Sequence, residues 1–451
     1  MFNTLKIAKP AVHSKVFLGI TLAAIAPTSS AFAAVDGETA FVFNTLLFLI
    51  GGFLVMFMAA GFAMLEAGLV RTKNVADICL KNVALYALAG LMFFLVGYNL
   101  MYAGVDGGYF GSLNLWGADD SAALLAEGAD YSAGYGSASD WFFQMAFVAT
   151  AASIVSGAIA ERTKLFSFLA FTAVLTGVIY PIVGAWTWGE GWLNIAGFKD
   201  FAGSTIVHST GGWAALVAAL IIGPRIGKYD KAGNVRPIPG SNLPLATLGT
   251  FILWFGWFGF NGASQLALGS AADAVAIGKI FANTNMAAAG GVLTALGLSR
   301  LLYKKVDLTM TLNGALAGLV SITAEPLTPT LGEAVLIGSI GAVIVMFAVP
   351  FLDRLKIDDV VGAIPVHLFA GIWGTLAVPL TNTDSHFQTQ LLGVGTVAIF
   401  VILTSGITLL AVNMLLGLRL SQEDEVMGSD RTELGLEAYP EFGHGTQKMG
   451  L

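Results

Sequence analysis

Residues 43–69 read FNTLLFLIGGFLVMFMAAGFAMLEAGL, and Glu66 is the single charged side chain in this stretch. A helix needs about 20 predominantly apolar residues to cross the hydrocarbon core of a membrane, so this run is long enough to span one. Ten further apolar runs follow, near residues 82–104, 141–160, 165–187, 203–223, 243–263, 275–301, 309–325, 333–352, 360–380 and 390–418.

These runs also limit the type of membrane fold. Within lipid the backbone must satisfy its own hydrogen bonds, which leaves only helices and closed barrels. The runs are continuous and lack the period-two alternation of barrel strands. The sequence therefore predicts an all-α membrane protein with eleven transmembrane helices.

The composition supports this class and excludes others. Of 451 residues, 56% are hydrophobic and 11% are charged, whereas soluble domains carry about 25% charged residues. The 55 glycines suit membrane helices that approach closely. The net charge of −7 arises largely in loops and a tail and indicates no nucleic-acid partner. A single cysteine, Cys79, excludes an intramolecular disulfide framework.

The basic residues of the connecting segments indicate the orientation, because cytoplasmic loops collect Lys and Arg. If the N-terminus lies outside, the basic residues after residue 33 fall in inside connections or the tail, with the exceptions of Lys199 and Lys279. The long outside segment 105–140 carries six carboxylates and no Lys or Arg. We therefore predict an N-out, C-in topology. Segment 105–140 is interpreted as a solvated acidic loop, with weak attraction of cations as the functional alternative.

The two ends of the chain differ from the apolar domain between them. Lys6, Lys9 and Lys15 precede an apolar stretch at 16–26, and Ala-Phe-Ala follows at 31–33, which is the pattern of a secretory signal peptide. We predict a cleaved signal over 1–33, with an uncleaved anchor as the rival interpretation. The mature N-terminus would then be periplasmic, in the inner membrane of a bacterium.

After an eleven-span domain at 34–420, the polar tail 421–451 is predicted to be cytoplasmic. It is too short to be an enzymatic or kinase domain.

Two of the five histidines lie inside predicted spans. His208 stands in TIVHSTGGWAAL (205–216) of the fifth span and His367 in AIPVHLFAGIWGTL (363–376) of the tenth, each within Val-His-x-x-x-Gly. Five spans separate them, which predicts an inverted repeat of spans 1–5 and 6–10. Ionisable residues inside membranes usually face a cavity or a partner. Either each histidine is hydrogen-bonded between packed helices, or the two share a site. A metal site is disfavoured, because zinc needs three or four ligands.

Aromatic clusters lie near the predicted outer helix ends: WFFQMAF (141–147), WTWGEGW (186–192) and ILWFGWFGFN (252–261). They form either an interfacial belt or a cage whose ring faces attract a cation. Sequence spacing leaves both interpretations open.

Several motifs together resemble the ammonium transporter (Amt/Mep/Rh) family, and in particular its bacterial Amt type. They are GFAMLEAGLVRTKN (61–74), FQMAF…SGAIAER (143–162), DFAGSTIVH (200–208), GWFGFNGAS (256–264) and DDVVGAIPVH (358–367). They run in family order across essentially the whole chain after the signal. The resemblance implies the ammonium transporter fold for residues 34–420.

The resemblance also implies roles for individual residues. Trp188, Phe147 and Ser264 look like the outer site that recruits ammonium. Phe147 and Phe260 resemble a stacked phenyl gate below it, and His208 and His367 resemble the twin histidines of the pore. Asp200 looks like a structural carboxylate that shapes the recruitment site.

The resemblance further implies a homotrimer with one pore in each subunit, and a regulatory tail contacted by PII (GlnK-type) signal proteins. It implies neither a metal nor a cofactor. Two positions depart from many relatives. Glu66 stands where an aromatic residue is common, and Gly362 stands where some carry Asp. We expect the first to alter the electrostatics of the inner gate and the second to alter packing around His367.

The predicted function is ammonium transport, with methylammonium as an analogue. NH4⁺ would be recruited outside and deprotonated, and NH3 would pass the histidines, with proton co-transfer left open. An uncoupled NH3 or CO2 channel and an ammonium sensor are the alternatives. A membrane enzyme is disfavoured, because no nucleophile–base set is visible.

Overall fold

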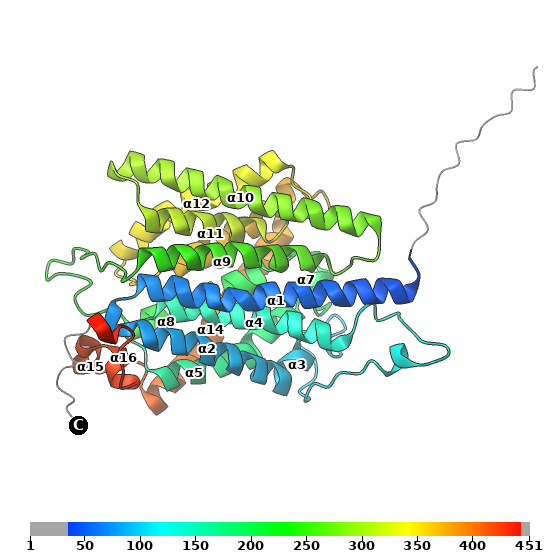
Figure 1. The fold of residues 1–451 in the computed structure, drawn as a ribbon, viewed down its shortest axis with the longest axis horizontal. Helices are drawn as coiled ribbons and strands as arrows, with labels where there is room; N and C mark the ends of the chain where they lie inside the picture. Colours follow the sequence, from blue (N-terminus) through cyan, green and yellow to red (C-terminus); the bar gives the residue numbers. More distant parts are fainter. Residues whose placement is uncertain (1–34, 443–451) are drawn as a thin grey trace, which may run out of the picture. The chain divides into compact units, whose positions relative to one another are not determined.

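The computed structural model describes residues 35–442, and the predicted signal peptide at 1–33 lies outside them. The described chain is helical, without named strands in this range (Figure 1). The labels η mark 3-10 and π-helical turns. The first part contains α1 (Gly37–Leu69), η1 (Thr72–Asn74), α2 (Val75–Met92), η2 (Phe93–Gly97), α3 (Tyr98–Tyr102), η3 (Ser121–Leu124), α4 (Ser137–Ala158), α5 (Leu165–Val174), η4 (Leu175–Ile179), α6 (Tyr180–Ala185), α7 (Trp192–Ile195), η5 (Ser204–Ser209) and α8 (Thr210–Ile222).

The second part ends in the tail. It contains α9 (Leu243–Gly262), η6 (Ala263–Gln265), α10 (Ala271–Tyr303), α11 (Leu308–Ile322), α12 (Leu331–Arg354), η7 (Ile364–Phe369), α13 (Ala370–Ala377), η8 (Val378–Leu380), α14 (Phe387–Leu416), α15 (Gln422–Met427), α16 (Ser429–Glu433) and η9 (Pro440–Phe442).

The apolar runs predicted from sequence all fall on helices. Nine helices within residues 35–442 are long and apolar enough to cross a membrane, and Leu308–Ile322 and Ile364–Leu380 are shorter apolar helices. The prediction of an all-α membrane protein is confirmed. That all eleven cross the membrane, with the N-terminus outside, stays a prediction.

Helix boundaries differ from the predictions where polar side chains find partners. Helix α1 starts at Gly37 rather than at 43, because Asp36 accepts a hydrogen bond from the Thr39 amide at 2.8 Å and caps the helix. The second span starts near Thr72 rather than at 82. Its charged residues Asp77 and Lys81 form a buried ion pair at 2.7 Å, which allows the helix to continue through them.

The helical bundle has two ends that are easily told apart (Figure 1). We call the end where α1 finishes and α15 and α16 lie the tail end. The other, which carries the segment 103–136, is the vestibule end. Helix α1 packs along α9, and α10 packs against α11 and α12. Helices α4 and η5–α8 are the most enclosed, with 89% and 78% of their apolar windows buried.

Ion pairs hold the connections at the tail end together. Glu161 pairs with Arg71 at 2.5 Å and with Arg225 at 3.4 Å, and Arg225 also pairs with Asp358 at 2.8 Å. Burial acts to raise the pKa of the Asp358 carboxyl. The hydrogen bonds and charge of Arg225 outweigh that effect and hold this pKa well below its usual value. This cluster joins the connections that follow α1, α4, α8 and α12.

The tail packs against the same end of the bundle. Asp430 accepts hydrogen bonds from the amides of Ala76 and Asp77 at 3.0 and 2.8 Å, which caps the start of α2. Glu425 pairs with Arg419 at 2.7 Å, and Glu433 accepts from the Leu165 amide at 2.7 Å. Residues 421–433 are therefore tied to the helices that they follow.

Two broken helices cross at the centre of the bundle. Helices η5–α8 and η7–α13 each begin with a π-helical turn, and each turn contains one of the two intramembrane histidines. At the crossing, a Cβ on Gly212 would lie 2.7 Å from the Cβ of Leu368, and a Cβ on Gly371 would lie 2.7 Å from the Ser209 hydroxyl. Gly212 thus faces Leu368, the residue after His367, and Gly371 faces Ser209, the residue after His208. This reciprocal contact fits the predicted inverted repeat.

Replacing Gly212 with alanine should destabilise the fold. The new methyl group meets backbone as well as side-chain atoms of Leu368, and such overpacking lowers the free energy of unfolding by about 1–3 kcal/mol. Thermal unfolding in detergent measures the change. Gly395→Ala on α14 is the matched control, because its Cβ would meet no atom within 4 Å. Equal melting temperatures for the two variants would contradict the tight crossing.

Candidate functional site

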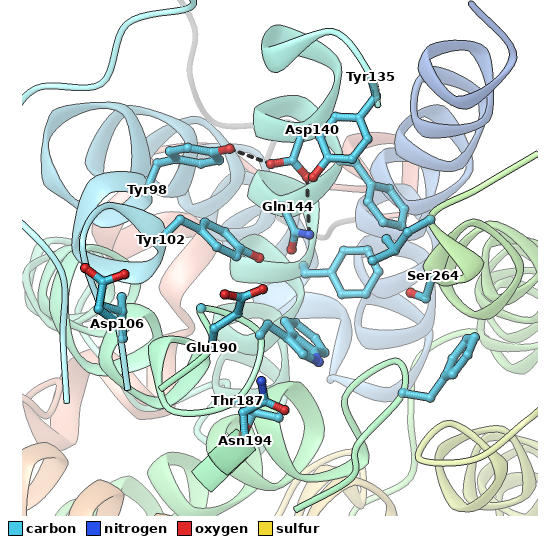
Figure 2. Close-up of a pocket in the computed structure, with 17 residues that line it drawn as sticks. Tyr98, Tyr102, Asp106, Tyr135, Asp140, Gln144, Thr187, Glu190, Asn194 and Ser264 are labelled. Atoms are coloured by element: carbon cyan, nitrogen blue, oxygen red, sulfur yellow. Dashed lines mark hydrogen bonds between the residues drawn. The ribbon is translucent and has the colours of Figure 1, made fainter. Parts of the chain in front are cut away.

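A cavity of about 510 Å³ lies at the vestibule end of the bundle (Figure 2). Aromatic and acidic side chains dominate its wall, and they come from segments far apart in the sequence. The lining residues are Tyr98, Tyr102, Val105, Asp106, Tyr135, Asp140, Phe143, Gln144, Phe147, Thr187, Trp188, Gly189, Glu190, Asn194, Phe201, Ser264 and Leu266.

The charges around this cavity favour a cation. Asp106, Asp140 and Glu190 contribute carboxyl groups, and none of the described lining residues is basic. Tyr98 donates a hydrogen bond to Asp140 at 2.5 Å (Figure 2). Asp106 and Glu190 adopt left-handed backbone angles, with φ of 43° and 59°, which non-glycine residues rarely do. Carboxylates without nearby basic residues raise the local concentration of cations.

The three residues predicted to form a recruitment site all line this cavity. The Trp188 indole donates to the carbonyl oxygen of Asp200 at 2.9 Å, which fixes its ring edge-on to Phe147 with the centroids 6.0 Å apart. The Ser264 hydroxyl donates to the Phe260 carbonyl at 2.8 Å. Its oxygen therefore keeps a lone pair with which to accept a hydrogen bond from a ligand.

The two residues predicted to form a gate stack directly on each other. The rings of Phe147 and Phe260 lie 4.0 Å apart at an interplanar angle of 26°. Both are buried, with exposed fractions of 1% and 0%. Phe147 lines the cavity, whereas Phe260 is absent from its lining. The stacked pair therefore closes the cavity on the side of the bundle interior.

The two histidines meet directly behind the phenyl pair. The Nδ1 atoms of His208 and His367 are 3.1 Å apart, and the two rings stack with centroids at 5.2 Å. His208 stacks on Phe260 at 5.3 Å and on Trp257 at 5.1 Å, while Phe62 lies 6.0 Å from His367. Between two neutral rings, one Nδ1 must donate while the other accepts. The buried Nε2 of His208 has no hydrogen-bond partner, so it can bind a passing polar molecule.

Asp200 positions the first of these histidines through the backbone. Its carboxylate accepts hydrogen bonds from the amides of residues 203, 204, 205 and 206, at 2.8 to 3.1 Å. A helix that begins inside a membrane protein has no water for its first N–H groups, and Asp200 takes that place. It is not among the residues that line the outer cavity, which fits a structural role.

Asp359 positions His367 in the same way, by accepting hydrogen bonds from backbone amides before the histidine. This residue was not singled out in the sequence. It accepts from the amides of Gly362 and Ile364 at 3.0 and 2.7 Å. The spacing Asp-x-x-Gly-x-x-x-x-His is common to Asp200–His208 and Asp359–His367 and could have revealed it. Gly362 has a φ of +81°. Gly362, which differs from some relatives, therefore occupies a turn that favours glycine, and η7 begins two residues later at Ile364.

The family model described as Ammonium Transporter Family matches residues 46–439. The chain belongs to the ammonium transporter family. It is 44% identical over 425 residues to ammonium transporter Amt2 of Archaeoglobus fulgidus, with 87% of each chain covered. It is 40% identical to a putative ammonium transporter of Synechocystis over 93% of each.

Solved structures of ammonium transporters and their relatives share the fold. A structure titled "Sensor Amt Protein" has a TM-score of 0.81 and 37% identity, and covers 88% of this chain and 100% of its own. Candida albicans Mep2 has a TM-score of 0.76 and 28% identity, with 90% and 93% covered. The ammonium transporter fold predicted from the motifs is confirmed.

The sequence did not predict that the acidic segment 105–140 and the aromatic clusters at 141–147 and 186–192 meet in one cavity, although each was considered as an attractor of cations. Tyr98, which comes from α3, was not singled out in the sequence. Trp257 was seen only as part of an aromatic cluster. It packs on His208 and is held by a hydrogen bond to Thr323 at 2.8 Å. Within residues 35–442, no group of three or more His, Cys, Asp or Glu is arranged to hold a metal ion.

Replacing Asp200 with asparagine should destabilise the histidine-bearing turn. The amide can still accept through one oxygen, but its NH2 group faces the N–H groups of Thr205 and Ile206, which become unsatisfied at about 1–3 kcal/mol each. Thermal unfolding of the purified protein measures the loss. Asp384→Asn, at an exposed position, is the control. A melting temperature of Asp200→Asn equal to that of the control would contradict the capping role.

Proposed function

We propose that this protein carries ammonium across the inner membrane by recruiting NH4⁺ at the outer cavity and passing NH3 through the bundle. One observation supports this most directly. The cavity, the stacked Phe147 and Phe260, and the paired His208 and His367 follow one another in a single file of ring contacts. The ion binds among Phe147, Trp188 and Ser264, and it loses its proton at the phenyl gate.

Selectivity for ammonium over K⁺ follows from two steps, a weak preference at the outer cavity and a much stronger one beyond the gate. Cation–π attraction contributes about 0.5–2 kcal/mol, but K⁺ is attracted as well. The Ser264 oxygen adds a preference for ammonium, because only ammonium has N–H donors. Beyond the gate, an ion meets buried apolar rings and a large desolvation penalty. Neutral ammonia avoids that penalty, and its single lone pair and N–H groups fit the paired imidazoles.

The surroundings of the pore belong to the same proposal. Eleven spans with the vestibule end outside place the acidic cavity toward the source of ammonium and the tail in the cytoplasm. A signal peptide at 1–33, a homotrimer with one pore in each subunit, and a PII-type signal protein acting on the tail are the expectations drawn from the family. The tail's hydrogen bonds to α2 and α5 support a regulatory role, since a partner that moves the tail also pulls on those helices.

An ammonium jump on a solid-supported membrane should evoke a current in the wild type. If the proton follows ammonia along the histidines, each ammonium taken up moves one charge. His208→Ala breaks the paired imidazoles and should abolish the current. A potassium jump of equal concentration should evoke no current in the wild type, because K⁺ cannot lose its charge at the gate.

Uptake of labelled methylammonium completes this test. Uptake without current in the wild type would reject proton co-transfer and favour an uncoupled gas channel. A wild type without either signal would contradict transport altogether. The empty membrane is the control for passive leakage of ammonia.

Ser264→Ala should weaken recruitment without closing the pore. Loss of one hydrogen bond of about 0.5–1.5 kcal/mol raises the half-saturating ammonium concentration by about twofold to tenfold. The concentration dependence of the current measures this. Thr396→Ala, at a partly exposed position of α14 outside the outer cavity, is the control. A half-saturating concentration identical to that of the wild type would remove Ser264 from the recruitment site.

Ammonium sensing is the second candidate, favoured by the likeness to the structure titled "Sensor Amt Protein". A sensor would bind ammonium at the outer cavity and report through the tail. Ammonium-dependent protection of residues 421–433 from hydrogen exchange, in a protein that does not take up methylammonium, would select this function instead.

A further inference from the structure

A second, much smaller cavity lies on the far side of the histidine pair. It has a volume of about 10 Å³, and both His367 and Glu66 line it. That is the space needed for about one water-sized molecule, and ammonia is of this size. Glu66 stands near the end of α1 toward the tail and is 1% exposed.

Glu66 is a buried carboxyl group that pairs with no cationic side chain among residues 35–442. Asn82 donates to it at 3.0 Å and Ser156 at 2.8 and 2.9 Å, and both donors are neutral. The ion pairs formed within residues 35–442 do not include it. Lys81 on the neighbouring helix is bound to Asp77 and to the Thr163 carbonyl, each at 2.7 Å. A buried carboxylate needs a counter-ion or a proton.

The other polar groups of this cavity favour a molecule that donates hydrogen bonds. Ser153 uses its hydroxyl hydrogen on the Ala149 carbonyl at 3.2 Å. Asn313 uses its amide nitrogen on the Val361 carbonyl at 3.2 Å. Both side chains therefore keep an oxygen as acceptor beside the Glu66 carboxyl. Ammonium, with four N–H donors and a positive charge, matches such a set, whereas an anion does not.

We propose that Glu66, Ser153 and Asn313 form an inner ammonium site in which Glu66 returns the proton to ammonia that has passed His367. The O–H bond of the Glu66 carboxyl breaks and a fourth N–H bond forms, which leaves a carboxylate beside NH4⁺. The ammonium ion then leaves toward the tail end. The proton removed at the outer gate crosses the His208–His367 pair and protonates the carboxylate again. One NH4⁺ is consumed outside and one is released inside. The proposal rests on the transport function argued above.

A purely structural role for Glu66 is the competing interpretation, since its hydrogen bonds connect α1 with α2 and α4. The two roles differ in what a neutral replacement changes. Glu66→Gln keeps the length and one hydrogen-bond acceptor but cannot give up a proton. A structural role predicts a lower melting temperature, and a proton-transfer role predicts a lower current from a protein that folds normally.

The test measures ammonium-evoked current and melting temperature for wild type, Glu66→Gln and Glu66→Asp. Glu66→Gln should lower the current by about tenfold or more, since a positioned acid contributes roughly 10²–10⁴ in rate. Its half-saturating ammonium concentration should stay unchanged, because the outer cavity is untouched. Glu66→Asp, which retains an acid, should recover part of the current.

Glu325→Gln is the matched control. Glu325 is also buried, with an exposed fraction of 8%, and accepts from the neutral donors Asn382 and Thr328. It lines neither cavity, so its replacement should leave the current unchanged.

Two results would overturn the inner site: an undiminished current in Glu66→Gln, and a current in Glu66→Asp no higher than in Glu66→Gln. If Glu66→Gln loses current and folded protein together, infrared difference spectra of the wild type decide. Ammonium should change a carboxyl band that shifts in Glu66→Asp, and a spectrum without such a band contradicts the proposal. A wild type without current or methylammonium uptake would reject transport itself, whereas an active wild type with unaffected Glu66→Gln rejects only the role of Glu66.

Discussion

Two helices of this protein begin inside the bundle, where their first N–H groups cannot reach water, and much of the site depends on how those groups are satisfied. Asp200 accepts from four of them at the start of η5, and Asp359 accepts from two at the turn into η7. An unsatisfied backbone group in such surroundings costs several kcal/mol. The two carboxylates therefore hold the π-helical turns in place, and those turns carry the histidines.

The crossing of the two broken helices then brings the imidazoles together. Gly212 and Gly371 allow the helices to touch where a side chain would separate them. The Nδ1 atoms of the two imidazoles lie 3.1 Å apart, within hydrogen-bond distance. Trp257 and Phe260 cover the His208 ring. The result is a pair of polar groups in otherwise apolar surroundings.

Polarity changes in steps along this path. Carboxyl groups surround the outer cavity, stacked phenyl rings close it, imidazoles follow, and a single carboxyl group lies beyond them. Carboxyl groups at the two ends can stabilise an ion, while the middle favours a neutral molecule. This order suits a substrate that can give up its charge on entry and recover it on exit.

The sequence by itself determined the helices and the two histidines, because a run of about 20 apolar residues has few alternatives in a membrane and an intramembrane histidine is rarely accidental. It also contained the repeated Asp-to-His spacing, although only the hydrogen bonds revealed what that spacing does. The tertiary structure alone brought Tyr98, Asp140 and Glu190 to the outer cavity beside the predicted Trp188, Phe147 and Ser264, since the first three come from separate segments. It alone placed Glu66 beside His367, across some 300 residues of chain. The pattern of apolar residues that predicts a helix lies within one short segment and can be read from the sequence. A cavity wall forms where distant segments pack together, and its residues have no regular spacing along the chain.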